Sequence, residues 1–123
     1  MIVRNYIKGE PLPEQLRTGF ENGSMPEWIW VCERDGKIVC LLVAAPAHIV
    51  VILLRVLSTL DAKITDMRSL LVHALSDIKE RGFSAYITWL NPEKPNENAL
   101  LNIIKNANGI EMEEEQVLCG GKI

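Results

Sequence analysis

His48 and Tyr86 are the two side chains whose types and positions could move a proton during catalysis. His48 stands at the start of an apolar run, where an imidazole could act as a general base near neutral pH. Tyr86 stands in a second apolar run, and its phenol could act as a general acid. The structural alternatives are a hydrogen-bonded histidine at a strand end and a core tyrosine whose hydroxyl reaches the edge.

The stretch from Ser58 to Leu71, STLDAKITDMRSLL, joins an apolar strand to an amphipathic helix. At such a junction the backbone amides of the helix start often hold a phosphate. Glycine is typical there because a Cβ keeps the phosphate away from the amides, yet this stretch has no glycine. Asp66 suits the helix dipole but repels an anion, which Lys63 and Arg68 offset only in part. The sequence therefore predicts an impaired phosphate site.

The three cysteines, Cys32, Cys40 and Cys119, match no spacing that is typical of a metal site. We interpret them as buried thiols in a reducing compartment. Cys119 could instead be a nucleophile, but no histidine accompanies it in the sequence. The sequence therefore predicts no metal centre.

The length of 123 residues and the apolar content of 48% predict one globular domain over residues 1–123. The net charge of −3, without a cluster of lysines and arginines, argues against nucleic-acid binding through phosphates. The first residues, MIVRNYIKGEP, lack the pattern of a signal peptide. We therefore expect a cytoplasmic location.

Residues 38–54 are almost all apolar and nearly long enough to span a bilayer. Pro46 and His48 lie near the middle of this run, and Arg55 follows it at once. We interpret the run as two buried strands joined by a turn at Ala44–Ala47, because proline cannot donate to a central ladder. A membrane span is the alternative, and we expect no membrane association.

Alternating apolar and β-branched residues predict the strands. Asp35 and Gly36 stand between two apolar runs and predict a hairpin, because both turn positions need positive φ. The strand at 48–57 is apolar on both faces, so helices are expected to cover both faces of the sheet. The expected strands are 2–7, 28–33, 37–43, 48–57, 83–90 and 110–119.

Three helices are expected between these strands. The first begins near Pro13, the second covers residues 66–81 with Thr65 as its N-cap, and the third is capped by Asn96 or Asn98. The order of elements predicts an α/β (α+β) domain with a mixed central sheet and helices on both faces. Strands 48–57 and 83–90, joined by a helix, are expected to be parallel.

This order of elements resembles GNAT, the Gcn5-related N-acetyltransferase superfamily, from about Trp28 to Gly109. The hairpin VCERDGKIV at 31–39 looks like the family's second and third strands, and Leu70–Leu71 falls where the central helix often has paired leucines. The resemblance implies a single GNAT-like domain, acetyl-CoA as the cofactor, and central-strand amides that hold the thioester carbonyl. The family's late pattern is matched by Asn96, Ala99, Lys105 and Gly109.

The resemblance also implies which positions would bind acetyl-CoA. The family loop reads Arg/Gln-x-x-Gly-x-Gly/Ala, and its usual glycine places fall on Lys63, Thr65 and Met67. A tyrosine often serves as general acid in the last helix, where this sequence has Ile103, and residues 48–57 contain no carboxylate that could act as a base. The equivalent cofactor positions are Leu57, Lys63, Ile64, Thr65, Asp66, Met67, Arg68 and Asn96.

Two functions are therefore open. The first is a non-catalytic relative that serves protein assembly, as a homo-oligomer or with a protein partner, in a bacterial complex or in a virion. Virion-associated phage proteins include GNAT-like members with a similarly eroded loop. The motivating observations are the missing glycines, Ile103 and the 14 residues after Gly109, which are few for two strands. The last strand is thus expected to be missing or supplied by a partner. The second function is an N-acetyltransferase or acyl-CoA binder that takes acetyl from acetyl-CoA to an amine.

Overall fold

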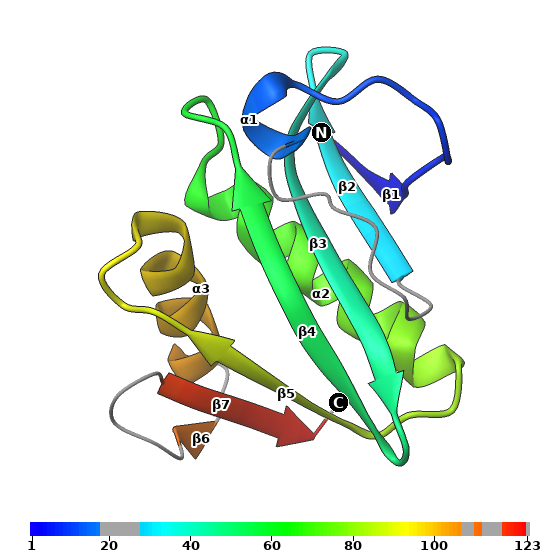
Figure 1. Ribbon diagram of the computed structural model, residues 1–123, viewed down its shortest axis with the longest axis vertical. Coiled ribbons are helices and arrows are strands. Elements are labelled where there is room, and N and C mark those ends of the chain that lie inside the picture. The colour runs from blue at the N-terminus through cyan, green and yellow to red at the C-terminus, as the bar shows by residue number, and fades with distance from the viewer. Residues whose placement is uncertain (18–27, 107–109, 112–116, 123) are drawn as a thin grey trace.

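A computed structural model describes residues 1–17, 28–106, 110–111 and 117–122 of the chain, with the side chains of the last two ranges left out. Helices separate groups of one to three strands along the described part of the chain (Figure 1). The elements are β1 (Ile2–Asn5), α1 (Glu14–Arg17), β2 (Trp28–Arg34), β3 (Lys37–Ala47), β4 (Val50–Ser58), α2 (Ile64–Glu80), β5 (Ala85–Leu90), α3 (Pro95–Asn106), β6 (Ile110–Glu111) and β7 (Val117–Lys122).

The described strands form one sheet in the order β1-β2-β3-β4-β5-β7-β6. Neighbouring strands are antiparallel except for β4 and β5, which are parallel. The helix α2 connects these two parallel strands. The predicted mixed sheet, with its parallel pair at this place, is confirmed.

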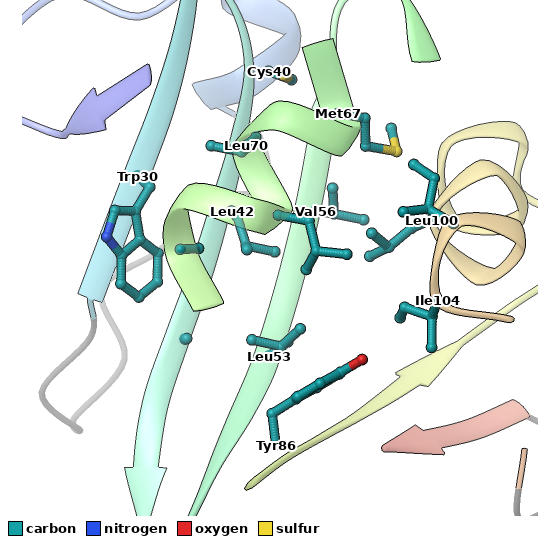
Figure 2. Close-up of a cluster of buried hydrophobic side chains, with 14 of the residues drawn as sticks. Trp30, Cys40, Leu42, Leu53, Val56, Met67, Leu70, Tyr86, Leu100 and Ile104 are labelled. Atoms are coloured by element: carbon teal, nitrogen blue, oxygen red, sulfur yellow. The ribbon is translucent and has the colours of Figure 1, made fainter. Parts of the chain in front are cut away.

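Helices cover both faces of the sheet, as expected. On one face α2 and α3 pack against β2, β3 and β4 through a buried cluster that includes Leu42, Leu53, Leu70 and Ile104 (Figure 2). On the other face Leu16 of α1 packs against a smaller cluster on β2 and β3. Trp30 fixes α2 along β2, because its indole N–H donates to Asp77 Oδ2 at 2.8 Å.

The hairpin between β2 and β3 forms at the predicted turn. Asp35 has φ 52° and Gly36 has φ 78°, so both turn positions adopt the left-handed conformation that an Asp-Gly pair favours. Arg34 and Lys37 close the turn as the last cross-strand pair.

The turn predicted at Ala44–Ala47 is wrong, because β3 continues through these residues to Ala47. The chain reverses instead at His48 and Ile49, with His48 at φ 60°. Pro46 lies within β3 and pairs with Val51 of β4. The apolar run is thus two strands, and no helix in the described part of the chain could cross a membrane.

The helix ends also differ from the expectation. The N-cap of α2 is Lys63 rather than Thr65, because the Asp66 carboxylate accepts from the Lys63 backbone N–H at 2.8 Å and so fixes the first turn there. The helix α3 begins at Pro95, a residue suited to a first helical turn. Asn96 and Asn98 therefore lie inside α3 and do not cap it.

The single last strand predicted at 110–119 is also wrong. Two strands occupy this part of the chain, and β7 pairs with β5 along its whole length, from Ala85 opposite Lys122 to Leu90 opposite Val117. The two-residue β6 pairs with β7. The expectation that the last strand is missing or supplied by a partner is therefore contradicted. Both β6 and β7 are short, so the residues after Gly109 suffice to form them.

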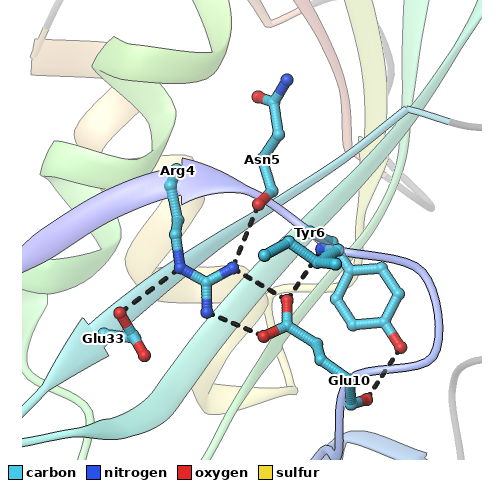
Figure 3. A network of polar contacts seen from close by, with 6 residues as sticks. Arg4, Asn5, Tyr6, Glu10 and Glu33 are labelled. Carbon is cyan, nitrogen blue, oxygen red and sulfur yellow. Dashed lines mark hydrogen bonds and ion pairs between the residues drawn. The ribbon is translucent and has the colours of Figure 1, made fainter.

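The N-terminal segment is held to the sheet by a polar network around Arg4 (Figure 3). The Arg4 guanidinium donates two bonds of 2.8 Å to Glu10 and one of 3.3 Å to Glu33 on β2. These bonds from Arg4 hold the pKa of Glu10 below its usual range. The Tyr6 hydroxyl donates to the Glu10 carbonyl at 3.0 Å.

The packing of α2 on the sheet predicts the cost of a core truncation. Leu70 is 1% exposed and Val72, two residues along the same helix, is 62% exposed. We expect Leu70→Ala to lower the free energy of unfolding by about 2–5 kcal/mol because it leaves a cavity. Val72→Ala is expected to change it by less than about 0.5 kcal/mol. Urea unfolding of both variants measures the difference, and equal losses would contradict the described packing.

Candidate functional site

A gap between β4 and β5 is the central feature of the site. The two strands pair only where Val51–Leu53 face Tyr86–Thr88. Beyond this point β4 continues to Ser58 and β5 to Leu90 without further pairing, and Figure 1 shows the two strands diverging. Peptide groups on the facing edges are therefore not used by the sheet.

A β-bulge sits where the strands begin to separate. Val43 pairs with Arg55 and the next residue, Ala44, pairs with Leu53. Leu54 is thus the extra residue on β4. A bulge bends its strand and strengthens the local twist, which accounts for the departure of β4 from β5 at this place.

The gap forms a cavity of about 370 Å³ whose lining includes Leu53, Val56, Leu57 and Leu100. Side chains from across the gap satisfy two carbonyls of β4. The Thr88 hydroxyl donates to Leu53 O at 3.0 Å, and Asn96 Nδ2 donates to Val56 O at 2.8 Å. In a strand the N–H and C=O of one residue point to the same side, so the Val56 N–H faces the gap as well.

A second cavity, of about 540 Å³, lies beside the start of α2. It is lined by the end of β4, the loop to α2 and the start of α3, and Asn96 lines both cavities. Its lining is largely apolar and includes Leu60, Ile64, Met67 and Ala99. Asn96 thus lies between the cavity beside the helix start and the gap.

Several amides around the start of α2 have acceptors within the chain, whereas the N–H groups of Ile64 and Thr65 have none among the described residues. The Lys63 N–H donates to the Asp66 carboxylate, and the Ala62 N–H donates to Thr59 O at 3.2 Å. The N–H groups of Asp66 and Met67 both donate to Lys63 O, at 3.0 and 3.2 Å. A bound phosphate would have to displace these acceptors.

Asp66 is fully buried and its charge is compensated inside the protein. It accepts two hydrogen bonds from Arg34 of β2, one of them at 3.2 Å from Nε, in an ion pair between the hairpin and α2. Burial acts to raise the pKa of Asp66, but the bonds from Arg34 and Lys63 and the charge of Arg34 outweigh it and lower the pKa. Asp66 therefore stays ionised without facing the second cavity.

The structure brings together part of the predicted cofactor set. Lys63, Ile64, Met67 and Asn96 line the second cavity, and Leu57 and Asn96 line the gap. Thr65 and Arg68 are exposed and line neither of these two cavities. Sequence reasoning missed the partner of Asp66, because Arg34 is 32 residues away and no local pattern joins them.

The two predicted proton-transfer residues are not brought to the gap. His48 is exposed in the turn after β3 rather than at the start of β4. Tyr86 is only 4% exposed, and Figure 2 shows it in the core beside Leu53 and Ile104. Neither lines either cavity. Ile103, at the family's tyrosine position, is a buried residue of α3.

The thiols of Cys32 and Cys40 are buried as expected and lie opposite each other on β2 and β3. Burial raises the pKa of both thiols, which keeps them protonated and unreactive at neutral pH. Cys119 lies on β7, and its side chain is outside the described residues. Within the described residues, no group of metal-ligand side chains is arranged to hold an ion.

The lowered pKa of Asp66 predicts how stability depends on pH. Its pKa in the folded protein lies below the unfolded value of about 3.9, so the stabilisation is complete above that pH and is lost as the pH falls through the folded pKa. We expect wild type to melt above Asp66→Asn at pH 7, with the difference in Tm shrinking below about pH 4. Thermal melts across this range test this; a difference that does not shrink would contradict the buried ion pair.

Comparisons with known proteins bear on the fold. No protein-family model and no curated protein sequence matches the chain. An aminoglycoside 6'-acetyltransferase type Ii superposes with a TM-score of 0.77 at 10% identity over 99% of this chain and 97% of that one. The ribosomal-protein-S18-alanine N-acetyltransferase from Escherichia coli gives 0.70 at 10% identity over 99% and 93%.

A GNAT family acetyltransferase from Elizabethkingia anophelis with acetyl-CoA bound is similar as well. Its TM-score is 0.66 at 10% identity, over 99% of this chain and 97% of that one. These similarities extend over nearly the whole chain, and β7 lies within the matched range. The chain therefore has the fold of the GNAT acetyltransferases.

Proposed function

We propose that this chain is a binding protein that holds an acylated pantetheine arm in the gap between β4 and β5 and does not transfer the acyl group. The observation that carries the proposal is the contrast between the two ends of the site. The gap keeps an edge of β4 that β5 does not pair with. Around the start of α2 the amides of Lys63, Asp66 and Met67 are bonded to the Asp66 carboxylate or to a backbone carbonyl, so fewer donors remain there for a diphosphate.

The gap suits a narrow chain that carries amide groups. The Val56 N–H faces it and can donate to a carbonyl of the arm, while Leu57 and Leu100 supply apolar walls. A pantetheine arm is such a chain, with two amides and a thioester. Donors that are already fixed in place hold a carbonyl without the cost of ordering them.

The start of α2 does not suit a diphosphate. At the glycine places of the family loop stand Lys63, Thr65 and Met67, and the place of its Arg/Gln, three residues before Lys63, holds Leu60. Side chains therefore stand where phosphate oxygens would approach the amides. We infer that the nucleotide half of CoA adds little to the affinity.

The absence of transfer is inferred from the groups around the gap. A general acid or base must lie within hydrogen-bond reach of the proton that it moves. Ile103 cannot donate a proton, Tyr86 is packed in the core and His48 is in the turn after β3. The one carboxylate among the described residues that line the gap is Glu97. It accepts from the Asn91 N–H at 3.1 Å and lies 3.6 Å from Lys94 Nζ, so both of its oxygens already have partners. A role in assembly, as a homo-oligomer or in a virion, is still supported by the missing glycines and by Ile103. The short chain end no longer supports it, because β7 is present and pairs with β5.

An N-acetyltransferase is the second candidate. Its support is that the solved structures similar to this chain over almost its full length are acetyltransferases, one of them with acetyl-CoA bound. An assay of acetyl transfer to a panel of amines distinguishes it. Turnover that is lost in Tyr86→Phe or His48→Ala would favour the enzyme over the binding protein.

Calorimetry with acetyl-pantetheine and acetyl-CoA tests the proposed function. We expect saturable binding of acetyl-pantetheine, with a stabilisation of about 2.7 kcal/mol at a hundredfold excess over Kd. Acetyl-CoA should bind with a Kd within about threefold of it, since its nucleotide finds no cradle, which corresponds to about 0.7 kcal/mol. Acetyl-CoA binding more than tenfold tighter would contradict the proposal.

Restoring the family loop should add affinity for the nucleotide. We expect Leu60→Arg with Lys63→Gly and Thr65→Gly to bind acetyl-CoA about tenfold tighter, because a hydrogen bond to a charged group contributes about 1.5–3 kcal/mol. Asp66 is retained because it fixes the helix start. Acetyl-pantetheine affinity should not change, which makes it the matched control. An equal gain for both ligands, or none for acetyl-CoA, would contradict the account of the loop.

A further inference from the structure

Two large apolar side chains project into solvent at the mouth of the second cavity. Leu60 is 93% exposed and Ile64 is 59% exposed, and both line the cavity beside α2. The diphosphate and sugar of a nucleotide are polar and would gain little from covering them, which leaves only its adenine ring for that contact. A protein surface with apolar side chains would cover them well.

Cationic side chains stand next to these apolar residues. Lys63 lines the same cavity and is exposed, as is Arg68, which lies one turn along α2 from Ile64. Asp66 adds no exposed negative charge because it is buried against Arg34. Asp61 is exposed, but it lines a different cavity together with the β2–β3 hairpin. Lys63 and Arg68 outnumber this one exposed carboxylate of residues 60–68, so the rim has a net positive charge on a chain of net charge −3. Such a rim complements an acidic partner.

We propose that the thioester arm reaches this site on an acidic carrier protein rather than on CoA, an inference that rests on the proposed function. A carrier-bound arm ends in a single phosphodiester on a serine, so it needs no diphosphate cradle. The carrier surface then covers Leu60 and Ile64, and the ammonium of Lys63 lies at the mouth where the single phosphate passes. This ligand does not require the amides of Lys63, Asp66 and Met67, which already have acceptors.

A binding assay with a bacterial acyl-carrier protein tests the inference. Its three ligands are the carrier with acetyl-phosphopantetheine attached, the carrier without its arm, and free acetyl-pantetheine. We expect the acetylated carrier to bind at least tenfold tighter than acetyl-pantetheine, and the carrier without its arm to bind more weakly than the acetylated carrier. Raising the salt concentration should weaken only the carrier complexes.

Two pairs of variants locate the contact. Lys63→Glu with Arg68→Glu should weaken carrier binding at least tenfold and leave acetyl-pantetheine binding unchanged. Lys79→Glu, at the exposed far end of the same helix, is the control. Leu60→Ser with Ile64→Ser should also weaken carrier binding, whereas Ile2→Ser, which removes a side chain that is likewise 59% exposed, should not.

The outcomes separate the two proposals. If acetyl-pantetheine binds as tightly as the acetylated carrier, the carrier inference alone is overturned and the proposed function stands. The carrier inference alone is also overturned if reversing the charges of Lys63 and Arg68 has no effect on carrier binding. A failure of acetyl-pantetheine to bind at all overturns the proposed function, and the carrier inference with it.

Discussion

The buried carboxylate of Asp66 governs what the start of α2 can bind. It accepts from Arg34 on one side and from the Lys63 N–H on the other, so a single side chain joins the β2–β3 hairpin to the helix and occupies a helix-start amide. A buried carboxylate that loses its partner is strongly unfavourable. The arrangement therefore cannot open for an incoming phosphate without a large compensating gain.

The other end of the site obeys the opposite constraint. The bulge at Leu54 and the end of pairing after Leu53 free one edge of β4. Thr88 and Asn96 satisfy two of the carbonyls on that edge, while the Val56 N–H remains directed into the gap. One end of the same strand–helix unit is thus closed by side chains and the other is open to a narrow chain. This contrast connects the fold to the proposed function.

Much of the fold could be predicted from local patterns. The Asp35–Gly36 turn, the parallel pair around α2 and the helices on both faces each follow from neighbouring residues. The turn at His48 could not be predicted, because Pro46 is a turn former in general and yet lies here within β3, opposite Val51 of β4. The pattern of residues 110–119 predicts a single strand because it contains no marked turn.

The candidate site was predictable only in outline. The missing glycines were visible in the sequence, and three of the predicted cofactor positions, Lys63, Ile64 and Met67, line one cavity in the structure. The role given to Asp66 was incomplete, since a sequence shows the charge of a residue and not its burial or its distant partner Arg34. Leu60 carried no signal, because an apolar residue in a loop gains meaning only once its exposure is known.

The most direct test is an amide NMR titration of the labelled protein with acetyl-CoA. If the account is right, the Val56 amide shifts on saturation while the amides of Lys63 and Asp66 stay unperturbed, because their acceptors are not exchanged for phosphate. Large shifts at Lys63 and Asp66 with an unchanged Val56 would show that the diphosphate displaces the Asp66 carboxylate, and would contradict the account.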